Sequence, residues 1–361
     1  MKYLSIIAGL SLLLLISCSS DTSPGTVVRE KPSINYAHGK INQVLIISDS
    51  SVWKGLPGDT FFYYFTAPYI LLPQPEPIFD INHLTMEELA KQSVKKEFRT
   101  IIFLADLNNL NSPTTRQVLA DIGPEKMAEA KKDQGYTVIV GHDKWARSQL
   151  LFYVAGFGEK KLVENIVKNF PAIARRINEK DNEIVKATAY QAGENADLEA
   201  EVKTLYSLNL KVPGDFKKVK YYTNTQTLWM RRDAREVVAN ILIHKIPYTN
   251  KSQLTKEGIK EIRNSIGKHI TTRQPNSFMR INDVDLPLFV ENTTLNNVYT
   301  VQAKGIWDIE NDFMGGPFVS NLMLNPKTNE LVLVDGFIYA PSKDKRNYMQ
   351  ELEFIIASAQ F

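Results

Sequence analysis

The chain has 361 residues, of which 43% are apolar, and its 43 basic and 40 acidic side chains give a formal net charge of +3. This length is enough for two domains of ordinary size or one large domain. The near balance of charge argues against the basic footprint of a nucleic-acid-binding protein, and a single cysteine excludes a disulfide framework.

The chain starts with MKYLSIIAGLSLLLLIS (residues 1–17), a short basic start followed by an apolar run of signal-peptide length. This run is too short to span a bilayer stably, and it ends in Leu15-Ile16-Ser17-Cys18. The ending resembles the lipobox of bacterial lipoproteins, which implies cleavage before Cys18 and attachment of acyl chains such as palmitate to that residue. More than one acyl chain anchors a protein stably to a membrane. The alternative is an ordinary secretory signal in which Cys18 has no role.

Residues 18–33 are rich in Ser, Thr, Pro and Gly, a composition that predicts a flexible tether. Folded structure should begin near Ile34. The residue after the cysteine is Ser19 and not Asp, which by resemblance to enterobacterial sorting rules favours the outer membrane. No dense acidic run follows, so we expect the protein to face the periplasm.

An N-terminal lobe is predicted over residues 34–190, where strand patterns alternate with helix patterns as in α/β layer structures. Strands are predicted at 41–48, 98–104 and 136–140. The prolines at 73, 75 and 77 predict an extended connector that leads into an edge strand. Thr85 and Ser112 are predicted N-caps, and residues 145–178 are predicted to be helical with a break at 156–158.

A C-terminal lobe is predicted over residues 191–361. Its predicted strands lie at 208–212, 216–222, 226–231, 237–246, 298–307, 317–324 and 331–339, and the last two form a hairpin. A helix is predicted at 255–270, and the polar stretch 271–296 is predicted to be a surface excursion. The fold class is therefore α+β, with two α/β-type lobes whose mixed or antiparallel sheets are flanked by helices. Each lobe ends in a strand, a polar link and an amphipathic helix, which suggests a duplication.

No motif identifies a reaction. The five histidines show no metal-ligand spacing, and neither a GxSxG elbow nor a phosphate-binding loop is present, so no metal or cofactor is predicted. His142 and Asp143 follow a predicted strand, where α/β folds place their sites. With Arg99 they form the alternative catalytic set of an envelope hydrolase. The simpler interpretation is that Asp143 caps a helix ahead of Trp145.

The stretch DFMGGPFVS (residues 312–320) combines two glycines and a proline between apolar segments. Glycine allows a positive φ and a close approach to a ligand, but the loop has no Lys or Arg for an anion. We interpret it as a turn that directs Trp307 and Phe313 onto the adjacent lobe, with partner contact as the rival. The binding candidates are Trp307, Phe313, Gly315, Gly316, Pro317, Phe318, Trp53, Trp145 and Gln149.

The chain contains several short motifs in this order: the lipobox, WKG at 53–55, LPQPEP at 72–77, DKWARSQ at 143–149, MGGPF at 314–318 and KR at 345–346. Together they resemble an uncharacterised lipoprotein family of the Bacteroidota, known as a domain of unknown function, over nearly the whole mature chain. The triplet at 98–100 departs from the more polar one expected there. The resemblance implies location and fold and carries no activity.

The sequence therefore predicts a lipid-anchored envelope protein that acts by binding a partner protein or polymer, or in an assembly. The alternative is a hydrolase with a site between the lobes. No partner, ligand or oligomeric state follows from the residues.

Overall fold

The computed structural model describes residues 34–69, 72, 74–234 and 236–361. The predicted signal peptide, Cys18 and the tether lie outside the described residues. No helix in the described part is both long and apolar enough to cross a membrane. Residues 35–361 form a single unit by their internal contacts.

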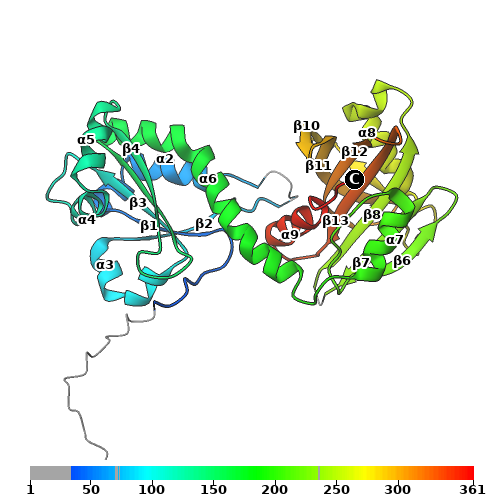
Figure 1. Cartoon of the computed structure of the whole chain (residues 1–361), viewed down its shortest axis with the longest axis horizontal. Helices are drawn as coiled ribbons and strands as arrows, with labels where there is room; N and C mark the ends of the chain where they lie inside the picture. The colour runs from blue at the N-terminus through cyan, green and yellow to red at the C-terminus, as the bar shows by residue number, and fades with distance from the viewer. Residues whose placement is uncertain (1–33, 70–71, 73, 235) are drawn as a thin grey trace, which may run out of the picture. The chain divides into compact units, whose positions relative to one another are not determined.

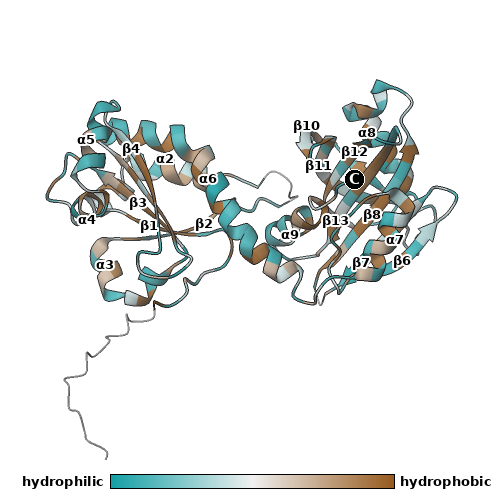
Figure 2. Ribbon diagram, viewed as in Figure 1, coloured by the Kyte–Doolittle hydropathy of each residue, from teal (hydrophilic) through white to brown (hydrophobic). Residues whose placement is uncertain are grey.

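The first half of this unit contains a five-stranded sheet with the order β2-β1-β3-β5-β4 (Figure 1). Its strands are β1 (Gln43–Ile47), β2 (Asp80–Leu84), β3 (Thr100–Asp106), β4 (Tyr136–His142) and β5 (Leu150–Gly156). All neighbours are parallel except β4, which runs antiparallel to β5. The central strands are buried on both faces, which explains their continuous apolar runs (Figure 2). The edge strand predicted after the prolines is β2.

Helices cover both faces of this sheet. They are α1 (Ser50–Trp53), α2 (Leu56–Phe65), α3 (Met86–Lys91), η1 (Ser93–Glu97), α4 (Pro113–Ile122), α5 (Pro124–Lys132) and α6 (Glu159–Ala189). The apolar side chains of α2 and α6 pack on one face, and those of α3 and α4 pack on the other. The predicted caps are confirmed: Thr85 forms a capping box with Glu88, and Ser112 accepts a hydrogen bond from the Thr115 N–H.

The helix predicted from residue 145 is wrong, because Leu150–Gly156 forms β5. This segment is apolar at every position, and periodicity alone does not separate a buried strand from a buried helix. The true helix α6 begins at Glu159, after the turn at Gly158.

The second half contains an antiparallel sheet with the order β10-β11-β12-β13-β8-β7-β6, and β9 also pairs with β11. The strands are β6 (Lys217–Tyr222), β7 (Thr227–Asp233), β8 (Val238–Pro247), β9 (Phe278–Asn282), β10 (Phe289–Leu295), β11 (Val298–Glu310), β12 (Gly315–Asn325) and β13 (Glu330–Tyr339). Apolar side chains of α7 (Ala196–Tyr206) and α9 (Arg346–Ile356) pack on one face of this sheet. Those of α8 (Lys256–Gly267), which follows η2 (Lys251–Leu254), pack on the other.

The α+β class with two flanked sheets is confirmed, and so is the hairpin of β12 and β13. Three expectations are corrected. Residues 208–212 form no ladder strand, because Asn209 makes only an isolated bridge with Gln360. The stretch 271–296 contains β9 and β10 instead of a plain surface loop. The two sheets differ in strand number, order and direction, which argues against a duplication.

A fully buried ion pair lies in the second sheet's core on the α8 side. Arg263 Nε is 2.8 Å from Asp335 Oδ1, and neither side chain has exposed surface. The Asp335 carboxylate also accepts a hydrogen bond from Ser320, and the guanidinium lies 3.6 Å from the centre of the Phe318 ring. Such a pair is tolerated in a core because each charge is compensated by its partner.

Candidate functional site

The candidate catalytic residues His142, Asp143 and Arg99 come to the same edge of the first sheet, because Thr100 and His142 both pair with Leu150, but among the described residues their side chains form no hydrogen bond or ion pair with one another. Strand β4 runs antiparallel to its neighbour β5, so His142 pairs with Leu150 at the edge where the parallel strands begin. Ligand sites in such sheets lie at the other edge, outside the carboxyl ends.

Asp143 is not a helix cap, which corrects the simpler interpretation. It has a φ of 51° and lies in the connection from β4 to β5, where its Oδ1 accepts a hydrogen bond from the Gln149 N–H at 3.1 Å. The Gln149 side chain is buried and donates to the carbonyl oxygens of Lys96 and Phe98, both at 2.7 Å. It also accepts from the Trp145 N–H. Gln149 therefore ties the loop together, and Trp145 packs 6.2 Å from the Phe103 ring.

The Gly-Gly-Pro stretch forms the start of β12 directly after the turn from β11. Neither Gly315 nor Gly316 has a positive φ, so the conformational reason for glycine is wrong. A Cβ at Gly316 would collide with the Ile338 carbonyl oxygen, and one at Gly315 would lie 2.8 Å from the Trp307 oxygen. Close packing of β11, β12 and β13 therefore requires these glycines.

The aromatic residues around this stretch are divided between core and solvent. Trp307 and Phe318 are buried in the core on the α8 side together with Phe337, and Pro317 is buried as well. Phe313 is fully exposed at the turn. Because Trp307 packs within its own sheet's core, the expectation that the turn directs it onto the adjacent lobe is wrong.

A serine–histidine pair lies at the carboxyl edge of the first sheet and was missed from the sequence. Ser48 follows β1, and its Oγ lies 2.9 Å from Nε2 of His83, whose ring stacks on Trp53 at 4.5 Å. Burial lowers the pKa of His83. Ser48 has no exposed surface, so its hydroxyl is closed to a substrate, and the pair fixes the loop after β1.

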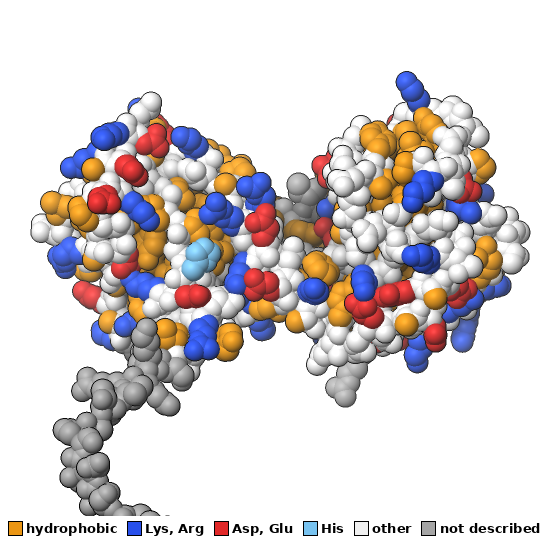
Figure 3. All heavy atoms as spheres, in the orientation of Figure 1, with side chains coloured by type: hydrophobic (Ala, Val, Ile, Leu, Met, Phe, Trp, Pro, Cys, Tyr) orange, Lys and Arg blue, Asp and Glu red, His pale blue; other side chains and the backbone are white. Residues whose placement is uncertain are grey.

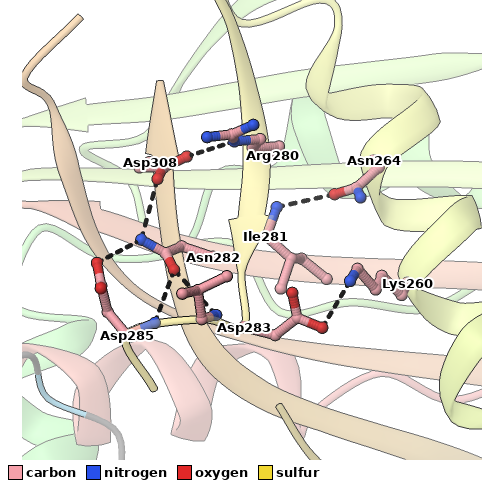
Figure 4. Close-up of a pocket in the computed structure, with 9 residues that line it drawn as sticks. Lys260, Asn264, Arg280, Ile281, Asn282, Asp283, Asp285 and Asp308 are labelled. Atoms are coloured by element: carbon pink, nitrogen blue, oxygen red, sulfur yellow. Dashed lines mark hydrogen bonds and ion pairs between the residues drawn. The ribbon is translucent and has the colours of Figure 1, made fainter. Parts of the chain in front are cut away.

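Two cavities lined by described residues bear on a binding role. The first, of about 510 Å³, lies beside α8, β9 and β11 (Figure 4). Its polar groups satisfy one another: Arg280 Nε lies 3.0 Å from Asp308 Oδ1, and the Asn282 amide donates to Asp285 and Asp308 at 2.7 and 3.0 Å. Lys260 is paired with Asp283. Each charged side chain that lines this cavity therefore already has a hydrogen-bond or ion-pair partner among the described residues.

The second cavity, here called the apolar cleft, has a volume of about 920 Å³. Segments distant in the sequence line it: the connector after α2, the middle of α6, the β10–β11 ladder and α9. Its apolar lining consists of Ala67, Pro68, Tyr69, Ile78, Phe170, Val185, Phe289, Val290, Phe354 and Ala357. Its polar lining consists of Asn178, Asp181, Asn182, Glu291, Gln302, Lys304, Gln350 and Glu353.

Most charges of the apolar cleft are already compensated. Asp181 is buried and lies 2.9 Å from the guanidinium of Arg99, which also donates to the Lys40 carbonyl oxygen at 2.6 Å. Burial raises the pKa of Asp181, and Arg99 opposes the shift. Glu353 accepts from the Tyr69 hydroxyl at 2.8 Å and from Lys304 at 3.1 Å.

Glu291 is the exception among the cleft's charged groups, because within the described residues it forms no ion pair. The cleft thus offers apolar walls and one free carboxylate. Of the sequence candidates, only Arg99 reaches it, and only through Asp181. The surface seen in Figure 3 mixes basic and acidic side chains, as the net charge predicts. No group of three or more His, Cys, Asp or Glu suited to a metal ion occurs in the described part.

Comparison with known proteins finds two domains of unknown function in this chain. A family model described as a domain of unknown function (DUF8532) matches residues 37–189, and a second (DUF4837) matches residues 195–358. Both are consistent with an uncharacterised family. None of the curated proteins matches the sequence.

Among solved structures, the chain shows a partial likeness to LpqN, described as involved in cell envelope biogenesis of Mycobacterium tuberculosis. The likeness covers 42% of this chain and 82% of that one, at 11% identity and a TM-score of 0.27. A score this low carries no conclusion about fold or function.

Proposed function

We propose that this protein is a lipoprotein of the cell envelope that acts by binding, held by acyl chains on Cys18 at the outer membrane and facing the periplasm. The apolar cleft is the observation that carries the binding role. Ligand sites are concave, have volumes of roughly 300 to 1,000 Å³, and combine apolar walls with few polar groups. The cleft, at about 920 Å³, lies within this range of volumes, and apolar residues form slightly more than half of its lining. Its ligand is an envelope protein or polymer.

The anchor is supported by the lipobox-like ending at Cys18, and it is tested separately from the cleft. Cells are fed an alkyne-bearing palmitate, and the wild type is compared with Cys18→Ser. We expect label and membrane flotation for the wild type and neither for the variant. Equal labelling of both proteins would contradict the anchor.

The binding role is tested by filling the cleft. Ala357 lines the cleft at the end of α9 and is exposed, so Ala357→Trp adds bulk there without disturbing the core. Ala200, exposed on α7 and outside the cleft, provides the matched control Ala200→Trp. Tagged proteins of equal thermal stability are incubated with lipid, glycan and polypeptide fractions of envelopes. We expect the wild type and Ala200→Trp to retain envelope material that Ala357→Trp does not retain. Equal retention by all three would refute a role of the cleft.

A further inference from the structure

Strand β10 forms one edge of the antiparallel sheet, and in the described part of the chain no strand pairs with its outer side. It is seven residues long, and its ladder with β11 runs without a register shift from Phe289 to Leu295. An edge of this kind presents a row of unpaired backbone N–H and C=O groups at regular spacing. Such a row matches the backbone of another extended chain.

The opposite edge of the same sheet is protected and β10 is not. Strand β6 carries Lys217, Lys218 and Lys220, and its ladder with β7 has a register shift between Lys218 and Lys220. Lysines and bulges are the devices that prevent edge pairing in natural sheets. The sequence of β10, FVENTTL, contains no lysine, no arginine and no proline, its one charged residue is Glu291, and its ladder has no bulge. The contrast within one sheet indicates that the β10 edge is kept open.

The β10 edge is also continuous with the apolar cleft. Alternate residues of a strand share a face, so Phe289 and Glu291 lie on the same face as Leu295, which packs on the α9 side. Phe289 is opposite Lys304 and Glu291 is opposite Gln302, and all four line the cleft. A strand added to β10 would therefore direct alternate side chains over the cleft.

We propose that the β10 edge, together with the cleft beside it, binds an extended polypeptide segment of a partner by strand addition. This inference rests on the proposed function and specifies the ligand. Main-chain hydrogen bonds to β10 supply affinity, and the cleft selects apolar side chains at alternate positions. Because Glu291 has no ion-pair partner among the described residues, a Lys or Arg of the segment is favoured beside it.

The test uses linear peptides selected from a displayed library against the full-length lipidated protein in detergent micelles. Binding of each selected peptide is measured by fluorescence anisotropy. In an antiparallel ladder, alternate residues direct their N–H groups toward the partner strand. Of the neighbours Thr293 and Thr294, one therefore donates to β11 and the other points outward. The variants Thr293→Pro and Thr294→Pro form a matched pair.

We expect one of these proline variants to keep the wild-type melting temperature and to weaken peptide binding by at least about tenfold, because it removes only an outward N–H. The other should lower the melting temperature. If both variants unfold, Thr293→Lys introduces the kind of charge that protects β6, and it should weaken binding without unfolding the protein. The mirror-image D-peptide should bind at least about tenfold more weakly than the L-peptide, because strand pairing is chiral. Glu291→Gln should weaken binding of Lys-bearing peptides by about two- to fivefold.

Five results would overturn the inference. Peptides that bind the folded proline and lysine variants as tightly as the wild type would be held by the cleft alone. Retention of only glycan, lost in Ala357→Trp, would leave the proposed function standing and exclude a polypeptide ligand, whereas retention of only lipid would exclude both the protein and the polymer that we propose. If the protein forms a dimer, and the proline variant that removes the outward N–H abolishes it, then the β10 edge binds a second copy of this chain. Absence of any retention that depends on Ala357 would remove the proposed function as well.

Discussion

Replacing Asp335 by Asn should destabilise the C-terminal lobe strongly, because Arg263 would keep its charge in a site with no surface exposure. The two side chains make two contacts, Nε to Oδ1 at 2.8 Å and Nη2 to Oδ2 at 3.3 Å. Breaking a buried ion pair from one side costs about 3 to 5 kcal/mol, since an uncompensated charge stays in the core. Asn keeps one acceptor oxygen, so we expect about 3 kcal/mol for Asp335→Asn and a similar loss for Arg263→Met.

The double variant Arg263→Met with Asp335→Asn decides whether the two losses have one cause. If they do, the double variant is less destabilised than the sum of the single variants by about 2 kcal/mol or more. Urea unfolding followed by tryptophan fluorescence measures this, since Trp307 lies in the same core. Arg175→Met, which removes an exposed ion pair with Glu179, is the control and should leave the midpoint unchanged. Additive losses would refute the coupling, and a wild-type midpoint for either single variant would refute the buried pair itself.

Gly316→Ala should lower the free energy of unfolding by about 1 to 3 kcal/mol, because the added Cβ would press against the Ile338 carbonyl. The control Phe313→Ala, at the exposed turn, should leave the melting temperature unchanged. Equal effects of the two substitutions would contradict the packing reason for glycine. Gln149→Ala removes one buried and one partly buried hydrogen bond to main-chain carbonyls and should lower stability by about 1 to 3 kcal/mol in chemical unfolding. A neutral result would mean that water replaces the amide. Burial lowers the pKa of His244 to about 4, so as the pH falls the unfolded chain binds a proton at this histidine before the folded protein does. The free energy of unfolding should therefore fall between about pH 6.5 and about pH 4. The loss should exceed that of a folded His244→Gln variant by up to about 3 kcal/mol. Parallel pH profiles of wild type and variant would exclude this role.

The order of strands and helices in the first lobe can be predicted where residues at the ends of an element mark its start or its end. Thr85 and Ser112 start their helices as expected, since a cap depends on residues within one turn. Leu150–Gly156 was misread because an apolar run buried on both faces has no period. Strand β10 was missed because its edge position leaves it polar and exposed.

The cleft could not be predicted from local sequence patterns. Phe170 belongs to an amphipathic helix, Phe289 to a polar stretch, and Glu353 to the last helix, and each is unremarkable in its own segment. Only the tertiary fold brings them together. The Gly-Gly-Pro stretch is conspicuous in the sequence, and strand packing alone explains why glycine is needed there.

Amide hydrogen exchange of the protein in gently solubilised envelopes, compared with the purified protein, tests the binding role of the cleft most directly. A ligand in the cleft should slow exchange in β10 and in residues 350–357 of α9 and its end, and leave the turn at 311–314 unchanged. Slower exchange at that turn, with β10 and α9 unaffected, would contradict the account and move the binding surface to the exposed Phe313.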